Sequence, residues 1–320
     1  LIKEKQKAND IEELIKYIKA PDFPTGGIIY GYEGVKEAFL TGRGKVVLRG
    51  KAIIETVDDR ESIIVTEIPY QVNKAEMIRK TAELVNEKKL EGIKTIRDES
   101  DRNGMRIVYV LKRDAIPNIV LNKLYKFTSL QSSFSVNNVA LVNGRPEMLN
   151  LKDMIHHFVE HRHEVVVRRT KFELKKAEDR AHILIGLSAS VENLDKVIKI
   201  IRSSKNPEDA KKSLLSTKWK ISKSQKLIKL IEGKKSSIQY SFTEPQVYSI
   251  LELRLQKLTA LGINEIEIEI KKLAELIIKY KKIISSKKEL LKIISLELKS
   301  IKEKFSVPRR TQIIDAVLNY

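Results

Sequence analysis

A heptad repeat of apolar residues runs through the C-terminal part of this chain almost without interruption. Starting at Ile263, residues recur at alternating spacings of three and four as far as Phe305, and Lys287 is the only charged residue among them. A seam with a period of about 3.5 residues stays in register only when its helix winds around another helix. We therefore predict a helix over residues 265–305, about 60 Å long at about 1.5 Å per residue, as one half of a coiled-coil arm. The other positions of the repeat are Ile266, Ile270, Leu273, Ile277, Tyr280, Ile284, Leu291, Ile294, Leu298 and Ile301.

A second long helix is predicted over residues 151–202. Asn150 precedes it as a capping residue, with Asp153 three positions later, and Lys205-Asn206-Pro207 ends it. Its second half carries an apolar stripe of Leu187, Val191, Leu194, Ile198 and Ile201. Two long helices on either side of a short insert predict an antiparallel arm, 151–202 with 264–307, that carries a helical tip over 203–263.

One short helix of the predicted tip is apolar on more than one face. Thr243 and Gln246 form a capping box at its start. One apolar face is expected to pack inside the tip, which leaves another for a partner. A second copy of the chain is the partner we expect, because a two-fold contact reuses one surface patch. The predicted dimer interface comprises Leu251, Leu253, Leu255 and Leu258.

Residues 24–150 predict one α+β domain, which follows a helical lead-in over residues 1–23. Strands are expected over 45–57 and 62–68. Asn73 and Glu76 cap a helix that reaches about Leu90, with Ile78, Ala82 and Val85 on one face. Asn103-Gly104 predicts a hairpin between strands 93–97 and 105–111, and a further helix covers 115–128. The predicted fold class is therefore α+β, followed by a long antiparallel coiled coil with a small helical tip domain.

The composition favours a polyanionic partner in a reducing compartment. Sixty-one Lys and Arg residues face 42 Asp and Glu residues, a formal net charge of +19. This excess favours DNA or RNA over an anionic membrane, although an AT-rich genome that encodes Lys freely also produces it. With no Cys, the chain has no disulfide, thiolate metal site or cysteine nucleophile, and a cytoplasmic location is expected. No apolar run is long enough to span a membrane. Because the chain begins with Leu, we expect it to be part of a longer protein.

Two clusters of metal-binding residue types have ordinary explanations. His156, His157, His161 and His163 lie close together, but the order His-Phe-Val-Glu-His is not the zinc motif His-Glu-x-x-His, so we predict a solvated or polyanion-facing helix. Asp98-Glu99-Ser100-Asp101 lies at a hairpin turn between arginines, which favours internal pairing over a bound cation. No catalytic arrangement of residues and no metal site is predicted in this chain.

The stretch Thr41-Gly42-Arg43-Gly44-Lys45 is the best candidate for nucleic-acid contact. Glycines let a backbone approach phosphate closely, and Arg43 and Lys45 neutralise its charge. A plain glycine-rich turn into a strand explains the same pattern equally well. The remaining residues of a nucleotide-binding phosphate loop are missing.

Nine short motifs, spread in order over nearly the whole chain, carry a resemblance to a known family. They are Pro21-Asp22-Phe23-Pro24-Thr25, Thr41-Gly42-Arg43-Gly44-Lys45, Glu67-Ile68-Pro69-Tyr70-Gln71-Val72-Asn73-Lys74, Arg97-Asp98-Glu99-Ser100-Asp101, Leu130-Gln131-Ser132-Ser133-Phe134, Arg168-Arg169-Thr170, Arg180-Ala181-His182-Ile183-Leu184, Leu253-Arg254-Leu255-Gln256-Lys257-Leu258-Thr259 and Pro308-Arg309-Arg310-Thr311. With these motifs the chain resembles the A subunits of bacterial type IIA topoisomerases. Leu149-Asn150-Leu151-Lys152 and the 253–259 segment look more like the gyrase branch than the topoisomerase IV branch.

The resemblance implies a division of labour within a larger enzyme. Residues 24–150 correspond to a tower that holds duplex DNA, and the arm and tip correspond to a dimeric exit gate for a second duplex. The winged-helix domain with the nucleophilic tyrosine would precede residue 1. The C-terminal wrapping domain would follow a linker that starts over 308–320, so this fragment alone is expected to be inactive. Mg²⁺ and ATP would bind the partner B subunit of the A2B2 complex, which drives strand passage and negative supercoiling on chromosomal DNA.

Within the tower, Arg43 and Lys45 are the leading DNA-binding candidates, followed by Arg49 and Lys74. Topoisomerase IV remains an alternative within the family. Two other classes are a coiled-coil DNA-organising scaffold and an RNA-binding α+β protein. The scaffold does not explain residues 24–150, and an RNA binder lacks an aromatic platform, since Phe, Trp and Tyr make up only 6% of the chain.

Overall fold

The fold of the chain is α+β, as predicted, with two sheets in one part and long paired helices in the other. The computed structural model describes residues 10–57, 59–222, 239–252 and 260–315, together with positions 225, 228, 229 and 231. They form two compact units. The sheet unit comprises residues up to 159 and from 305 onward, and the arm unit comprises residues 160–304.

The first sheet of the sheet unit has four strands and is covered by a helix on one face. Its order is β12-β1-β2-β7, with β1 parallel to β12 and antiparallel to β2. Helix α2 (Glu33–Thr41) packs against β2. The strands are β1 (Ile28–Tyr30), β2 (Arg43–Arg49), β7 (Gln131–Asn137) and β12 (Gln312–Ile314). The core between helix and sheet contains Ile29, Val35, Phe39, Val46 and Leu48, joined by Ile11 from the lead-in.

The glycine-rich stretch before β2 is a helix packed closely on a strand, which was not predicted. A Cβ at Gly34 would lie 1.9 Å from the Lys45 backbone oxygen, and a Cβ at Gly44 would lie 2.3 Å from the Gly34 oxygen. Gly42 ends α2 with a left-handed φ of 84°, the usual C-terminal role of glycine. The glycines are therefore explained by helix–strand packing and not by the approach of a phosphate.

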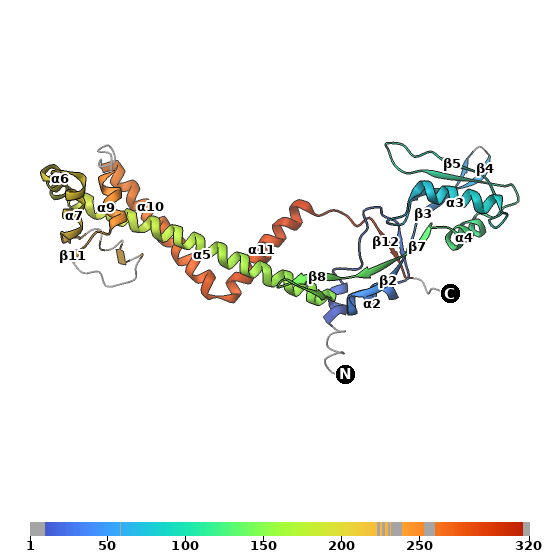
Figure 1. The fold of residues 1–320 in the computed structure, drawn as a ribbon, viewed down its shortest axis with the longest axis horizontal. Coiled ribbons are helices and arrows are strands. Elements are labelled where there is room, and N and C mark those ends of the chain that lie inside the picture. The colour runs from blue at the N-terminus through green and yellow to red at the C-terminus, as the bar shows by residue number, and fades with distance from the viewer. Residues whose placement is uncertain are drawn as a thin grey trace, which may run out of the picture. The chain divides into compact units, whose positions relative to one another are not determined.

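The second sheet has the order β3-β4-β6-β5, and Figure 1 shows α3 and α4 beside it. Its elements are β3 (Lys51–Val57), β4 (Arg60–Glu67), α3 (Lys74–Asn86), β5 (Ile93–Asp98), β6 (Ile107–Leu111) and α4 (Pro117–Phe127). The helices and one sheet face enclose a core that includes Ile63, Val65, Met77, Ile107, Tyr109, Val120 and Leu124.

The single strand predicted over 45–57 is wrong, because Gly50 divides it between the two sheets. The Gly50 N–H donates to the Leu130 backbone oxygen at 2.8 Å, which ends the run of β2. A Cβ at this position would lie 2.5 Å from Leu130 Cδ1 and 2.7 Å from the Glu67 oxygen. A residue with a side chain would collide with both neighbours, so the chain passes between sheets at its one glycine.

In this unit the predicted helix cap and hairpin are confirmed, whereas the predicted buried face of α3 is not. Asn73 caps α3 by accepting from the Glu76 N–H at 3.0 Å, and the hairpin at Asn103-Gly104 joins β5 to β6, as predicted. The helix ends at Asn86 instead of Leu90, because Lys88 adopts a left-handed φ of 56°. Its fully buried residues are Met77 and Thr81. The predicted face of Ile78, Ala82 and Val85 is only partly buried.

Within the segment predicted to begin a linker at 308, Gln312–Ile314 form strand β12 of the first sheet. Strand β12 pairs with β1, and Thr311, which is 1% exposed, bonds the Pro21–Gly26 segment. Asp22 accepts from the N–H groups of Thr311 at 2.9 Å and Arg310 at 3.2 Å. Burial raises the pKa of Asp22, but these backbone donors outweigh burial, so the pKa lies below its ordinary value. A small hairpin, β8 (Val139–Val142) with β9 (Arg145–Met148), completes the unit.

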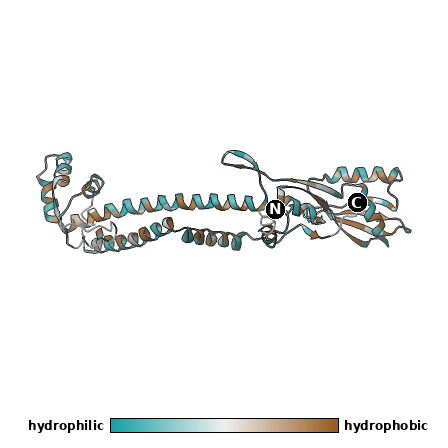
Figure 2. Ribbon diagram, turned by 90° about the horizontal axis from the view of Figure 1, so that it is seen from below, coloured by the Kyte–Doolittle hydropathy of each residue, from teal (hydrophilic) through white to brown (hydrophobic). Residues whose placement is uncertain are grey.

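The arm unit contains the predicted antiparallel helix pair. Lys281 lies 2.9 Å from Glu178, and Arg180 lies 2.8 Å from Glu269, so the two helices run in opposite directions. Figures 1 and 2 both show α5 and α10 side by side, and in Figure 2 hydrophobic and hydrophilic residues alternate along them. The helices are α5 (Leu151–Glu192), α6 (Leu194–Ser203), α7 (Pro207–Ser216), α9 (Glu244–Leu251), α10 (Ala260–Ser285) and α11 (Lys287–Phe305). Among the described residues, no helix is long and apolar enough to cross a bilayer.

The heptad helix is not continuous, and the residues buried next to its break differ from the predicted ones. Ile270 and Ile277 are buried as predicted. The helix stops at Ser285, and Ser286 caps α11 by accepting weakly from the Glu289 N–H at 3.4 Å. Around this point Ile283 and Leu290 are buried instead of Ile284 and Leu291, whereas Ile294 is buried at its predicted position. Lys287, the one charged residue of the repeat, is the first residue of α11. It therefore lies at the break and does not occupy a core position of the coiled coil.

The helix predicted over 151–202 also ends early. Asn193 interrupts it, and its side-chain amide donates to the backbone oxygens of Ala189 and Lys220, both at 2.9 Å. The chain then continues as α6, in which Val197 is buried and Ile201 is 37% exposed. The part of the predicted stripe that lies beyond Leu187 therefore does not pack along the antiparallel helix of the arm, because α6 packs on α7.

The tip of the arm has its own core around Trp219, which is fully buried. The predicted capping box of Thr243 and Gln246 is present at the start of α9. Gln246 is also fully buried, and it donates to the His182 backbone oxygen and the Tyr240 hydroxyl, both at 2.7 Å. Of the predicted interface residues, Leu251 is partly buried against this core. Leu253, Leu255 and Leu258 lie outside the described residues.

Candidate nucleic-acid interface

The uncovered face of the first sheet gathers three of the four predicted DNA-binding residues. Side chains alternate across a strand, so the odd-numbered residues of β2 share the face opposite α2. These residues are Arg43, Lys45, Val47 and Arg49. Their partners across the ladder on β7 are Asn137, Ser135, Ser133 and Gln131, in the same order. The sheet therefore presents three cations and Val47 beside a row of amides and hydroxyls, and we call this surface the basic face.

The cations of the basic face are available to an external anion. Arg43 and Lys45 are exposed, and within the described part of the chain neither forms an ion pair. No acidic residue occupies β2 or β7. Guanidinium, ammonium, amide and hydroxyl groups are the side chains that most often contact DNA phosphates. The face can thus bind a polyanion without first breaking internal ion pairs.

Arg49 is held in place at one end of the basic face. Its guanidinium carbon lies 3.4 Å from the centre of the Tyr30 ring and 4.6 Å from that of Tyr125. Its Nε donates to Gln131 Oε1 at 2.6 Å. Burial raises the pKa of Tyr125, only partly offset by Arg49, so the phenol stays protonated and donates to the Gly50 oxygen at 3.1 Å. Stacked guanidinium groups lose little freedom on binding, so Arg49 is pre-organised.

Lys74 lies apart from the other three candidates. It is the first residue of α3, beside the second sheet, and its Nζ lies 2.7 Å from Asp98 Oδ2. The Lys74 ammonium, with help from Ser100, lowers the pKa of Asp98 to about 2. A lysine paired with an ionised carboxylate is already neutralised. The structure therefore does not bring Lys74 into the basic face.

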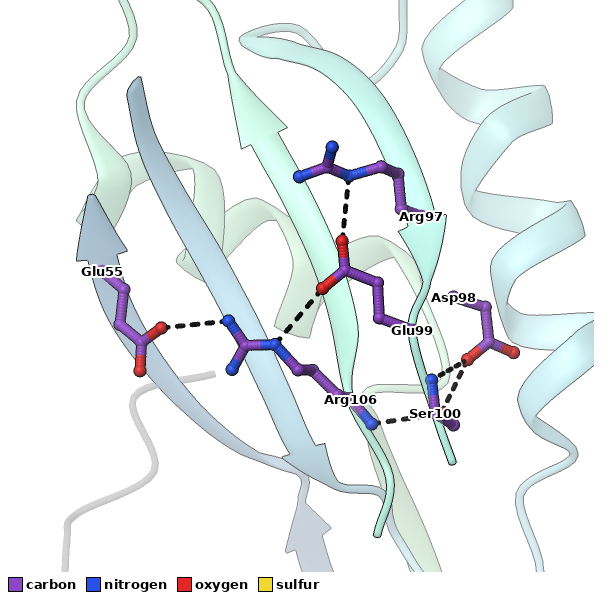
Figure 3. A network of polar contacts seen from close by, with 6 residues as sticks. All are labelled: Glu55, Arg97, Asp98, Glu99, Ser100 and Arg106. Carbon is purple, nitrogen blue, oxygen red and sulfur yellow. Dashed lines mark hydrogen bonds and ion pairs between the residues drawn. The ribbon is translucent and has the colours of Figure 1, made fainter. Parts of the chain in front are cut away.

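The open face of the second sheet is charged but internally balanced, as Figure 3 shows. Arg106 bridges Glu55 at 3.2 Å and Glu99 at 3.3 Å, and Glu99 also pairs with Arg97 at 3.2 Å. Ile64 and Val108, on the strands of this sheet, are fully buried and pack with Val110 and Val57. The prediction that the acidic turn pairs internally is confirmed. The arginines of this network are therefore already paired, in contrast to Arg43 and Lys45 of the basic face.

The histidine cluster has no metal-site geometry. His156 and His157 lie on α5 with ring centres 5.6 Å apart. Among the described residues, no group of three or more His, Asp or Glu side chains could hold a metal ion.

The polar half of the basic face was not among the predicted site residues. Gln131, Ser133, Ser135 and Asn137 alternate with Phe134 and Val136, a period-two pattern that predicts a strand with one polar face. That signal was present in the sequence. The pairing of this strand with β2, which lies about 90 residues earlier, was not, because register between distant strands is set by tertiary contacts.

Comparisons with known proteins identify the family. Residues 1–299 match the family model for the A subunit of DNA gyrase/topoisomerase IV. The DNA gyrase A subunit of Rickettsia felis is 47% identical over 311 residues, covering 95% of this chain and 34% of the relative. Its counterpart from Pseudomonas aeruginosa is 44% identical, covering 95% and 35%, and that of Halalkalibacterium halodurans 46%, covering 95% and 34%. The chain belongs to the family of DNA gyrase/topoisomerase IV A subunits, and it spans about a third of the length of these relatives.

Proposed function

We propose that this chain is the duplex-holding and exit-gate portion of a DNA gyrase A subunit. The observation that carries the proposal is the basic face, where unpaired Arg43 and Lys45 lie beside the hydroxyls and amides of β7. Contacts of this kind position a duplex through its phosphates and do not read its sequence. The family's general role, together with relatives that are named as DNA gyrase A subunits, supports DNA as the polyanion.

The proposed activity belongs to a larger assembly. In this proposal the complete protein forms an A2B2 complex with a B subunit, which binds Mg²⁺ and ATP and drives double-strand passage and negative supercoiling. The work takes place on chromosomal DNA in the cytoplasm. None of the ten tyrosines is assigned the role of the DNA-cleaving nucleophile, so this portion contributes binding and gating. Decatenation, as in a topoisomerase IV, is the alternative within the same family.

The salt dependence of duplex binding tests the basic face. Log affinity falls with log salt concentration with a slope of about −0.9 for each phosphate contact. The double variant Arg43→Ala, Lys45→Ala is expected to weaken binding to a fluorescent duplex and to reduce the slope by about 2. The matched control is Lys80→Ala, Lys94→Ala, which removes two exposed lysines outside the basic face. Equal slopes for the wild type and the basic-face variant would refute the assignment.

The exit-gate part of the proposal concerns the tip. A second copy is proposed to contact the segment from Leu251 to Leu258, as a two-fold gate requires. Leu251→Glu and Leu255→Glu are expected to shift the mass measured by light scattering toward the monomer. Ile278→Glu, at an arm position that is 59% exposed, is the matched control. Because Leu251 also packs against the tip core, emission from Trp219 must show that the tip is still folded. A wild-type chain that is monomeric at every concentration would contradict the gate.

A further inference from the structure

Helix α4 carries exposed apolar side chains beside the face that packs on the core, and we call this exposed stripe the outer face. Val120 and Leu124 are buried beneath the helix. On the outer face Ile119 is 51% exposed and Phe127 is 46% exposed, and Ile116, which caps the helix, is 59% exposed. Positions 116, 119, 123 and 127 fall on one stripe of a helix. An apolar stripe that remains exposed in this way is typical of an interaction surface.

Basic residues surround the apolar stripe. Lys112 and Arg113 precede the helix, and Lys123 and Lys126 lie on it, whereas Asp114 is the only acidic residue between 112 and 127. Within the described part of the chain, these four cations form no ion pair. Lys126 Nζ lies 5.7 Å from the centre of the Phe127 ring, so charge and apolar surface are interleaved.

We infer that the outer face of α4 is a docking site for an acidic amphipathic helix of a partner protein. Apolar anchors three, four or seven residues apart on such a helix would cover Ile116, Ile119 and Phe127. Asp or Glu residues on either side of the anchors would pair with the surrounding lysines. This surface is separate from the basic face, and the inference does not depend on the proposed DNA binding.

Charge and hydrophobicity favour this occupant over two others. Duplex DNA would use the lysines but would leave Ile116 and Ile119 without an apolar partner, unlike the fully polar row on β7. A second copy of α4 would place Lys123 and Lys126 against the same lysines across a two-fold axis. Like charges in direct opposition oppose such pairing. An acidic helix satisfies both the stripe and its rim.

A designed peptide tests the inference directly. The probe is a fluorescein-labelled helical peptide of about 18 residues, with Leu at i, i+3 and i+7 and Glu on either side. We expect it to bind the whole chain, and Ile119→Glu and the pair Lys123→Glu, Lys126→Glu each to weaken binding by about tenfold or more. Ile53→Glu, on β3 and 41% exposed, is the matched control. A scrambled peptide of equal composition should bind weakly.

A second measurement uses the unaltered chain, so that the result does not depend on a variant that folds. With isoleucine methyl groups labelled for NMR, the peptide should shift Ile116 and Ile119 and leave Ile53 and Ile54 unchanged. The inference would be overturned if the scrambled peptide bound as tightly as the designed one, or if Ile119→Glu left binding unchanged. It would also be overturned if the Ile116 and Ile119 methyl signals did not shift. Displacement of the peptide by a short duplex that shifts the same methyls would assign the face to nucleic acid instead.

Discussion

The Thr311 hydroxyl oxygen accepts a hydrogen bond from the backbone N–H of Phe23 at 2.8 Å, although 288 residues separate the two. The same hydroxyl donates to the Gly26 backbone oxygen at 3.1 Å. Through this contact the chain returns from the arm and enters the first sheet as β12. One short polar side chain thus links an early segment of the sheet unit to β12, which pairs with β1, the neighbour of the strand that carries the basic face.

Removing the Thr311 hydroxyl is expected to destabilise the sheet unit. Thr311→Val keeps the shape but leaves the buried Phe23 N–H without its acceptor, a loss of about 1–3 kcal/mol. Urea unfolding followed by circular dichroism measures it. Thr95→Val, at an exposed position of β5, is the control and should change the midpoint little. Equal midpoints for both variants would show that the contact does not stabilise the sheet.

The ion pair of Lys74 and Asp98 predicts a pH-dependent contribution to stability. The folded-state pKa of Asp98 is lowered from 3.8 to about 2, so the carboxylate stabilises the fold above pH 4. The contribution is lost as the pH falls from about 4 to about 2, where the folded state also becomes protonated. The difference in unfolding midpoint between wild type and Asp98→Asn should therefore shrink over this window. A difference that is constant from pH 6 to pH 2 would contradict the pairing.

Gly34 is expected to tolerate no side chain. A Cβ at this position would lie 1.9 Å from a backbone oxygen of β2, so Gly34→Ala must separate α2 from the strand. We expect a loss of about 1–3 kcal/mol, together with weaker duplex binding, because Lys45 lies at the point of contact. Glu37→Ala, on the exposed side of α2, is the control. Thermal unfolding and duplex titration measure the two effects, and an unaltered melting temperature would rule out the close packing.

Gln246 is expected to hold the tip together. Gln246→Met keeps the volume but leaves the His182 backbone oxygen and the Thr243 N–H without their partner, a loss of about 1–3 kcal/mol. Emission from Trp219, the only tryptophan, reports on this loss. The ring centre of Trp219 lies 5.0 Å from that of Phe242, and Phe242 in turn contacts Tyr240. Urea unfolding followed by Trp219 emission should shift to lower urea. Ser249→Ala, at a partly buried position of α9, should leave the curve in place, and equal curves for both variants would contradict this role of Gln246.

The sequence by itself determined the features that depend on near neighbours. Caps at Asn73, Asn150 and Thr243, the hairpin at Asn103-Gly104 and the two long helices were all predicted, because each depends on residues within about one turn of one another. The heptad predicted a helical partner and an antiparallel pair. Its break at Ser286 was not predicted, because the apolar spacing continues through a position where the packing does not.

Only the tertiary structure determined which side chains lie together on one surface. Gly50 sends one apparent strand into two sheets, and β12 returns from the end of the chain to complete the first. Arg43, Lys45 and Arg49 came together because they alternate along one strand, whereas Lys74 was separated from them by its pairing with Asp98. Local patterns fix how a segment folds, but the partner of each segment depends on contacts between distant residues. The basic face arises from such contacts, and no window of the sequence contains all of it.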